Sequence, residues 1–236
     1  MNAPTPRPPH RSPSLRRSVT LFTKPAVPGR VKTRLHPALG AEGAARFHEA
    51  LLGDVLETLR GGPWSLTVAW ALTAGEVPPA LDGAHALRQE GEDLGARLHH
   101  ALSVAARDHE VVAAVGSDHP ELAAATVEDA FACLDAGSDV VFGPVDDGGY
   151  FLVAARADVL TPELFRDIPW STEAVLETSL ERAAARALRV ELLPPGHDID
   201  RPDDLDALEA RLGEPGAAPC PRTRAFLRTR TTKASR

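Results

Sequence analysis

A short basic loop is the first stretch of this sequence that could do chemistry. Within KPAVPGRVKTR (24–34) the cations are Lys24, Arg30, Lys32 and Arg34, and two prolines and a glycine shape the chain between them. Cationic side chains and free backbone N–H groups between a strand and a helix favour the binding of a phosphate chain. The spacing is not that of a P-loop, and no GxGxxG pattern is present. A solvated basic loop is the alternative.

Aspartates follow two of the expected strands. Asp118 comes after the apolar run VVAAV, and Asp198 and Asp200 fall on the same side of an extended segment. Asp118 could also simply cap the next helix, since Pro120 suits a first helical turn. If Asp118 and Asp200 meet at about 4 Å, they repel by roughly 4 kcal/mol at an effective dielectric near 20, so a cation must compensate them. Mg²⁺ or Mn²⁺ is the predicted cofactor, because such ions bind one or two carboxylates together with substrate phosphates. The candidate metal ligands are Asp118, Asp200 and Asp198.

Two further loops are candidates for substrate binding. The turn GPVDDGGY (143–150) has adjacent acids and glycines, which suggests close approach by a ligand or another backbone, although a plain hairpin turn would look similar. The candidate substrate residues are Asp146, Asp147, Gly148, Gly149, Tyr150, Trp170, Ser171 and Thr172. Packing is the alternative role for Trp170. Gln89, Gly95 and Arg97 form a weaker candidate contact to the base or sugar of a nucleotide.

The elements that must position these residues alternate along the chain. Strand-like runs cover 18–24, 66–72, 111–118, 139–145, 149–156 and 189–195, and helical patterns cover 41–60, 93–108, 121–135, 171–187 and 202–212. The run VVAAV is apolar on both faces, as a central parallel strand covered by helices must be. We therefore predict an α/β fold, a three-layer α/β/α sandwich with a mostly parallel mixed sheet. In such sheets the ligand lies outside the carboxyl ends of the strands, where the candidate residues stand.

Composition and charge limit the function classes. The 236 residues, 43% hydrophobic and 25% charged, fit one globular domain, and no apolar run is long enough to span a membrane. We expect a basic Pro-rich disordered arm (1–17), a single nucleotide-binding domain (18–213) and a basic flexible tail (214–236), located in the cytoplasm. Without the ten positive charges of the two ends, the middle carries about −17, which disfavours nucleic acid as a partner. The nine histidines and two cysteines show no zinc-ligand spacing.

Six segments in order resemble one protein family. FTKPAVPGRVKTRL, QEGEDLGARL, GSDHPEL, GPVDDGGYFLVA, IPWST and DIDRPDDL resemble the bacterial DUF2064 proteins of the glycosyltransferase-A (GT-A) superfamily, some of which are named arsenosugar biosynthesis glycosyltransferases. The resemblance covers about 19–212 and implies a GT-A-type fold. It implies that Asp118 and Asp200 are the two metal-binding aspartates and that 24–34 is the phosphate-binding region. Two departures are His119, where the family usually has cysteine, and Arg201, where it has threonine.

Three functions remain open at this point. The preferred hypothesis is a metal-dependent glycosyltransferase that takes a nucleotide-sugar and a small-molecule acceptor, with Asp118, Asp200 and Lys24 as the catalytic residues. The alternative is a nucleotidyltransferase that consumes a nucleoside triphosphate, because the opening loop also looks like that of 2-phospholactate guanylyltransferases. The third is a nucleotide-binding protein without turnover. The sequence does not indicate the oligomeric state.

Overall fold

A computed structural model describes residues 16–234 of the chain, so most of the predicted arm (1–15) and the last two residues lie outside it. The strands are β1 (Arg17–Thr23), β2 (Ser65–Trp70), β3 (His85–Arg88), β4 (Val111–Gly116), β5 (Val140–Pro144), β6 (Tyr150–Arg156) and β7 (Val190–Leu192). The helices are α1 (His36–Arg60), α2 (Leu94–Ala105), α3 (Ala124–Asp135), α4 (Val175–Ala184), α5 (Pro202–Gly213) and α6 (Pro221–Ala234). β3 and α6 were not predicted from the sequence.

The strands form one sheet in the order β3-β2-β1-β4-β6-β5-β7. β1 is parallel to both β2 and β4, and β6 alone runs antiparallel to its neighbours β4 and β5. The prediction of a mostly parallel mixed sheet is therefore confirmed. Because the strands on either side of β6 point the same way, the loops after β1, β4 and β5 all leave from one edge of the sheet.

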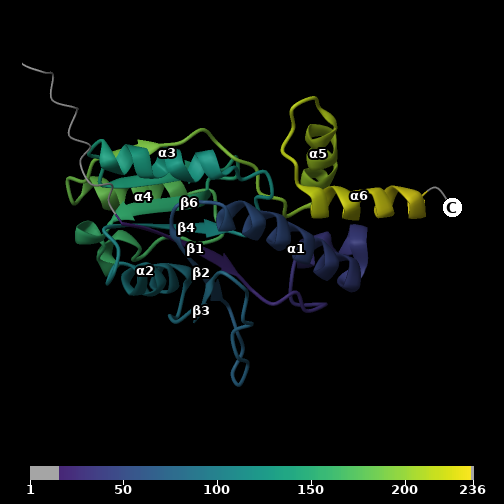
Figure 1. Ribbon diagram of the computed structural model, residues 1–236, viewed down its shortest axis with the longest axis horizontal. Coiled ribbons are helices and arrows are strands. Elements are labelled where there is room, and N and C mark those ends of the chain that lie inside the picture. The colour runs from purple at the N-terminus through teal and green to yellow at the C-terminus, as the bar shows by residue number, and fades with distance from the viewer. Residues whose placement is uncertain (1–15, 235–236) are drawn as a thin grey trace, which may run out of the picture.

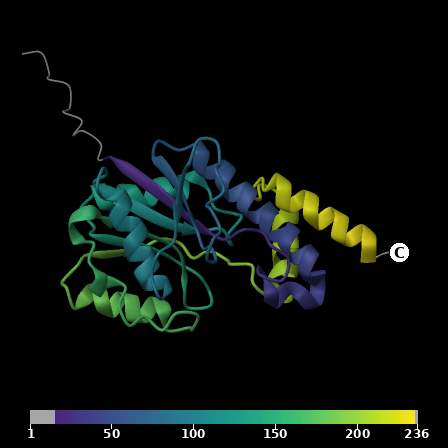
Figure 2. The ribbon, with the colours of Figure 1, turned by 90° about the horizontal axis from the view of Figure 1, so that it is seen from below.

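Helices cover both faces of the sheet, as the central strand requires. Side chains of β4 alternate between the two faces: Val111, Ala113 and Val115 pack with α1 and α3, whereas Val112 and Ala114 pack with α2. All five residues are at most 3% exposed, which is why the run is apolar without interruption. The two helical layers lie on opposite sides of the sheet in Figures 1 and 2.

A third apolar cluster lies beyond the end of the sheet, between α1, α5 and α6. Its members include Phe47 and Leu51 of α1, Leu205 and Leu208 of α5, and Leu227 of α6. This cluster fixes α5 next to the edge of the sheet from which the functional loops leave, as Figure 2 shows.

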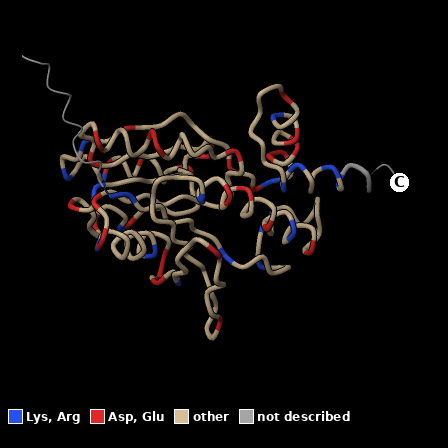
Figure 3. The backbone as a smooth tube through the Cα atoms, viewed as in Figure 1, with Lys and Arg blue, Asp and Glu red and all other residues tan. Residues whose placement is uncertain are grey.

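The segment from 214 onward differs from the predicted flexible tail, because 221–234 form a helix that packs on α1. The carboxylate of the buried Asp54 on α1 accepts hydrogen bonds from the backbone N–H groups of Arg222 and Thr223, at 3.0 and 2.8 Å. Figure 3 shows the basic residues spread along α6. The sequence of α6 lacks an apolar stripe, so contacts with α1 that are distant in sequence decide its structure.

Replacing Asp54 with alanine is therefore expected to lower the free energy of unfolding by about 1–3 kcal/mol, because two N–H groups in the first turn of α6 lose a charged acceptor. Urea unfolding followed by circular dichroism measures the change. Glu57→Ala is the matched control, since Glu57 is an exposed carboxylate one turn further along α1. An equal loss of stability in both variants would show that Asp54 does not hold α6.

Candidate functional site

The predicted aspartate pair does meet at one edge of the sheet. Asp118 follows β4, and Asp200 lies in the loop between β7 and α5. The Lys32 Nζ atom lies 2.9 Å from Asp118 Oδ1 and 2.9 Å from Asp200 Oδ1. It also donates to the backbone oxygen of Ile199 at 2.6 Å. The cation between the two aspartates is thus a lysine of the same chain.

The loop that carries Lys32 is tightly turned. Hydrogen bonds from Val27 N to Pro25 O and from Arg30 N to Val27 O shape it, at 2.8 and 3.0 Å. Lys32 itself has a left-handed backbone conformation, φ 45° and ψ 43°, directly before the short 3₁₀ helix 33–35. A side chain at positive φ is uncommon outside glycine. This backbone conformation turns the lysine side chain inward, where it is only 3% exposed.

The charges in this cluster are strongly coupled. Burial by itself would lower the pKa of Lys32, but the negative charges of Asp118 and Asp200 outweigh burial and raise that pKa. Burial alone would raise the pKa of Asp118, and Lys32 and His48 hold it below its ordinary value instead. Lys32 and Asp118 are therefore both charged at neutral pH, and the buried ammonium is paired as burial of a charge requires.

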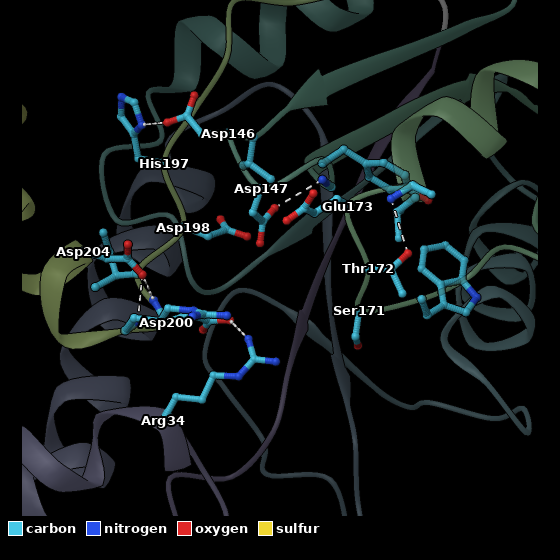
Figure 4. A pocket seen from close by; sticks show the side chains of 18 of the residues that line it. Arg34, Asp146, Asp147, Ser171, Thr172, Glu173, His197, Asp198, Asp200 and Asp204 are labelled. Carbon is cyan, nitrogen blue, oxygen red and sulfur yellow. Dashed lines mark hydrogen bonds and ion pairs between the residues drawn. The ribbon is translucent and has the colours of Figure 1, made fainter.

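Asp198 is the third predicted metal ligand, and no ion pair holds it within residues 16–234. Loss of hydration raises its pKa to about 7, and the charges of Asp118, Asp200 and Asp147 add to the effect of burial. In Figure 4 the carboxylates of Asp198 and Asp147 point into the same space. Among the described residues no group of three His, Cys, Asp or Glu side chains is arranged to hold a metal ion.

A small basic cavity lies beside the lysine bridge. Its volume is about 190 Å³, and its lining residues are Lys24, Lys32, Thr33, Arg34, His48, Asp118 and Asp200. The Arg34 guanidinium lies 3.5 Å from Asp200 Oδ2, and within residues 16–234 Lys24 forms no ion pair. Lys24 and Arg34 are therefore the cations that can bind an anion in this cavity. Three of the four predicted phosphate-binding residues are brought together.

Arg30, the fourth predicted phosphate-binding residue, points elsewhere. Its guanidinium forms a two-pronged ion pair with Glu76, at 2.6 and 3.2 Å, and the pKa of Glu76 falls to about 2 because of the hydrogen bond to Arg30. Glu76 belongs to the long loop between β2 and β3, which projects from the body in Figure 1. Arg30 thus anchors this loop.

Gln89, Gly95 and Arg97 hold backbone in place and do not line either of the two cavities described here. The Gln89 amide donates to the backbone oxygens of Thr23 and Ala69, at 3.2 and 2.9 Å. Arg97 Nε donates to Gly91 O at 3.0 Å. At Gly95 an added Cβ would lie 2.2 Å from the backbone oxygen of Phe165, so only glycine fits. These residues fix the ends of β1 and β2 and the start of α2.

A much larger acidic cleft adjoins Asp200 as well. Its volume is about 1400 Å³, and its charged or aromatic lining residues are Arg34, Asp146, Asp147, Tyr150, Trp170, Glu173, His197, Asp198, Asp200, Arg201, Asp204 and Arg211. Gly149, Ser171 and Thr172 line it as well. The acidic cleft and the small basic cavity share Arg34 and Asp200. The predicted substrate loops therefore face one common space (Figure 4).

Gly148 lies in the turn after β5, between residues that line this cleft. Its φ is 84°, and an added Cβ would lie 2.0 Å from the backbone oxygen of Glu173. Leu176 N donates to Gly148 O at 2.8 Å, which ties the turn after β5 to the start of α4. Trp170 packs edge-on against Tyr150, with ring centroids 6.2 Å apart, and both rings border the cleft. The glycine in the turn is required by close backbone packing, as the sequence suggested.

Comparisons with known proteins bear on the family and the fold. The family model described as "Uncharacterized protein conserved in bacteria (DUF2064)" matches residues 57–172. The resemblance to DUF2064 is confirmed. The matched stretch includes Asp118 and the loops at 146–150 and 170–172, whereas 24–34 and 198–200 lie outside it. No sequence among the curated proteins matches the chain.

Solved structures share the fold. A candidate nucleotide-diphospho-sugar transferase from Desulfovibrio desulfuricans G20 is 28% identical, with a TM-score of 0.84 over 92% of this chain and 95% of that one. A nucleotidyl transferase from Methanothermobacter thermautotroptrophicus is 20% identical, with a TM-score of 0.57 over 91% and 99% of the two chains. A cytidylyltransferase from Leptospira borgpetersenii is 11% identical, with a TM-score of 0.55 over 94% and 96%. The last two show likeness of fold alone.

Several residues of the site were missed in the sequence analysis. His48 of α1 is buried, its Nε2 lies 3.0 Å from Lys24 O, and its Nδ1 lies 3.8 Å from Asp118 Oδ1. His197 Nδ1 lies 2.6 Å from Asp146 Oδ2 across the acidic cleft. Neither histidine belongs to a motif with a recognisable spacing, so the sequence did not indicate a role for them. Among the segments that carry the DUF2064 resemblance, none includes His48.

Within residues 16–234, every helix is too short or too polar to cross a membrane.

The raised pKa of Asp198 predicts a pH-dependent stability. Between the unfolded value of 3.8 and about 7, the folded chain holds a proton that the unfolded chain has lost. The free energy of unfolding should therefore fall as the pH rises through this range. Asp198→Asn removes the titrating carboxyl group and with it this fall in stability. The Tm of the variant should therefore exceed that of the wild type by more at pH 8 than at pH 4, with EDTA present.

Thermal unfolding at both pH values measures this difference. Asp203→Asn is the control, because Asp203 is an exposed carboxylate in the same acidic segment. A Tm difference for Asp198→Asn that does not change with pH would contradict the assignment of the titration to Asp198.

Proposed function

We propose that the chain is a transferase that takes a nucleotide-sugar donor, with the donor diphosphate in the small basic cavity and the second substrate in the acidic cleft. The observation that carries this proposal is the contiguity of the two spaces, which share Arg34 and Asp200. A donor whose diphosphate is held by Lys24 and Arg34 would place its sugar at the mouth of the cleft. The 28% identical neighbour, named for nucleotide-diphospho-sugars, supports the same class of donor.

The proposed chemistry is mainly positional and electrostatic. Transfer from a nucleotide-sugar leaves a nucleoside diphosphate, on which negative charge develops as the bond to the sugar breaks. Lys24 and Arg34 face the small basic cavity and would stabilise that charge. The cleft would hold the acceptor in line with the donor.

The charge of the cleft favours a neutral or cationic second substrate. Six carboxylates and three guanidinium groups line it, and Arg211 is already paired with Glu121 at 2.6 Å. Carboxylates accept hydrogen bonds from hydroxyl groups, and the Trp170 and Tyr150 rings offer an apolar wall. An acceptor that carries a phosphate or carboxylate would be repelled. Hydroxyl-bearing sugars or polyols are therefore the favoured acceptors.

The role of a metal stays a prediction. The predicted ligands Asp118 and Asp200 each face Lys32 at 2.9 Å, so their side chains do not leave an open place for a second cation between them. No step of the proposed reaction is assigned to Mg²⁺ or Mn²⁺.

Nucleotidyl transfer from a nucleoside triphosphate is the second candidate. The cations of the basic loop favour it, because a triphosphate carries more charge than a diphosphate. Two structural neighbours are named for nucleotidyl or cytidylyl transfer, at 20% and 11% identity. A nucleotide-binding protein without turnover is the third candidate, and it would bind nucleotides tightly without forming any product.

One assay separates these candidates. The protein is incubated, with and without Mn²⁺, with a panel of nucleotide-sugars and sugar acceptors or with nucleoside triphosphates and the same acceptors. Release of a nucleoside diphosphate from a sugar donor is the expected result. Release of pyrophosphate from a triphosphate would replace the proposal by the second candidate, and the absence of both products despite tight binding would favour the third.

Lys24→Ala is expected to weaken the binding of UDP or GDP about ten- to a hundredfold, because a charged hydrogen bond to phosphate is worth about 1.5–3 kcal/mol. Isothermal titration calorimetry measures the dissociation constants. Arg46→Ala is the control, since Arg46 is an exposed cation on α1 outside both cavities. Equal affinities for wild type and Lys24→Ala would remove Lys24 from the phosphate site.

A further inference from the structure

Three oxygens surround the ammonium group of Lys32. It donates to Asp200 Oδ1 at 2.9 Å and to the backbone oxygen of Ile199 at 2.6 Å, and it forms an ion pair with Asp118 Oδ1 at 2.9 Å. Two of the three hydrogens of the ammonium are therefore donated within the chain. Lys32 is held by acids of its own chain, although the sequence placed it among the phosphate-binding residues.

The surroundings hold Lys32 in this position. Its side chain is 3% exposed, and its backbone has the left-handed conformation that non-glycine residues rarely adopt. Such a conformation persists where the surrounding structure determines it. Here the following 3₁₀ turn contributes, since Leu35 N donates to Lys32 O at 2.9 Å.

The contacts of Lys32 join three segments that are distant in the chain: the basic loop, the end of β4 and the loop before α5. Ile199 N also donates to Asp118 O at 3.2 Å, so the last two segments are hydrogen-bonded directly. A cation shared by two carboxylates from separate loops is an arrangement that metal sites often use. In this chain a side chain makes the same links.

We propose that Lys32 is an internal cation that occupies the place of a divalent metal between Asp118 and Asp200, and that removal of its ammonium converts the pair into a Mg²⁺ or Mn²⁺ site. Magnesium holds oxygen ligands at 2.0–2.1 Å, which is closer than the 2.9 Å at which lysine holds each carboxylate. The ammonium and a metal ion therefore exclude one another at this position. The charge supports this, because Lys32 together with Arg34, 3.5 Å from Asp200 Oδ2, balances the two carboxylates.

The test compares metal binding by the full chain with and without the ammonium, in the absence of nucleotide. Lys32→Met keeps most of the length of the side chain and removes its charge. After treatment with a chelator, Mn²⁺ is titrated into wild type and variant and followed by calorimetry and by the electron paramagnetic resonance signal of free Mn²⁺. We expect Lys32→Met to bind one Mn²⁺ at least tenfold more tightly than wild type, and Mn²⁺ to raise the Tm of the variant but not of the wild type.

A second variant assigns the new site. Adding Asp118→Asn to Lys32→Met removes one ligand, so the gain in Mn²⁺ affinity should disappear. Lys32→Arg keeps the positive charge and should show no gain.

Two results would overturn the proposal. One is a folded Lys32→Met protein that binds Mn²⁺ no better than wild type. The other is a wild-type protein that binds one Mn²⁺ as tightly as magnesium-requiring transferases do, with the loss of that binding in Asp118→Asn. The second measurement needs only variants that keep Lys32, so the proposal can be rejected even if Lys32→Met does not fold. No nucleotide is used, so these results do not depend on the proposed transferase function.

Discussion

One ion cluster, with a buried lysine between two part-exposed aspartates, organises the candidate functional edge of this protein. The Lys32 ammonium lies between Asp118 and Asp200 and donates to the Ile199 backbone, so the basic loop, the end of β4 and the loop before α5 meet at a single nitrogen atom. The Lys32 side chain is only 3% exposed, so its charge would be costly without the two carboxylates, which are themselves part-exposed. The cluster also positions Lys24, Arg34 and Asp198, because they belong to two of these three segments, the basic loop and the loop before α5.

The cluster also separates two spaces of opposite character. Lys24 and Arg34 line the small cavity with positive charge, although Arg34 also pairs with Asp200, and the carboxylates of Asp146, Asp147 and Asp198 make the large cleft acidic. An anion and a hydroxyl-rich molecule could thus be held next to one another without sharing ligands. Such a division suits the transfer of a group from a phosphate-bearing donor to an uncharged acceptor.

The C-terminal helices contribute one wall of the cleft and hold that wall in place. α5 supplies Asp204 and Arg211 to the wall of the cleft, Arg201 directly before the helix lines it as well, and the pair between Arg211 and Glu121 fixes α5 to the segment after β4. α6 packs on α1, and buried Asp54 satisfies the N–H groups of its first turn. The third apolar cluster, between α1, α5 and α6, therefore positions cleft-lining residues that lie outside the central sheet.

The sequence by itself determined the α/β class, the central strand and the loops that carry the site, because an uninterrupted apolar run such as VVAAV and polar residues directly after strands follow from local patterns. The need for glycine at position 148 could also be predicted, since a tight turn permits few other residues. Local patterns could not determine the pairing of long side chains across the fold. Tertiary structure alone turned Arg30 towards Glu76, placed His48 beside Asp118, docked α6 on α1 and put Lys32 where a metal was expected. The reason is physical: each of these contacts joins residues distant in sequence, and a flexible charged side chain takes the partner that the folded chain brings within its reach.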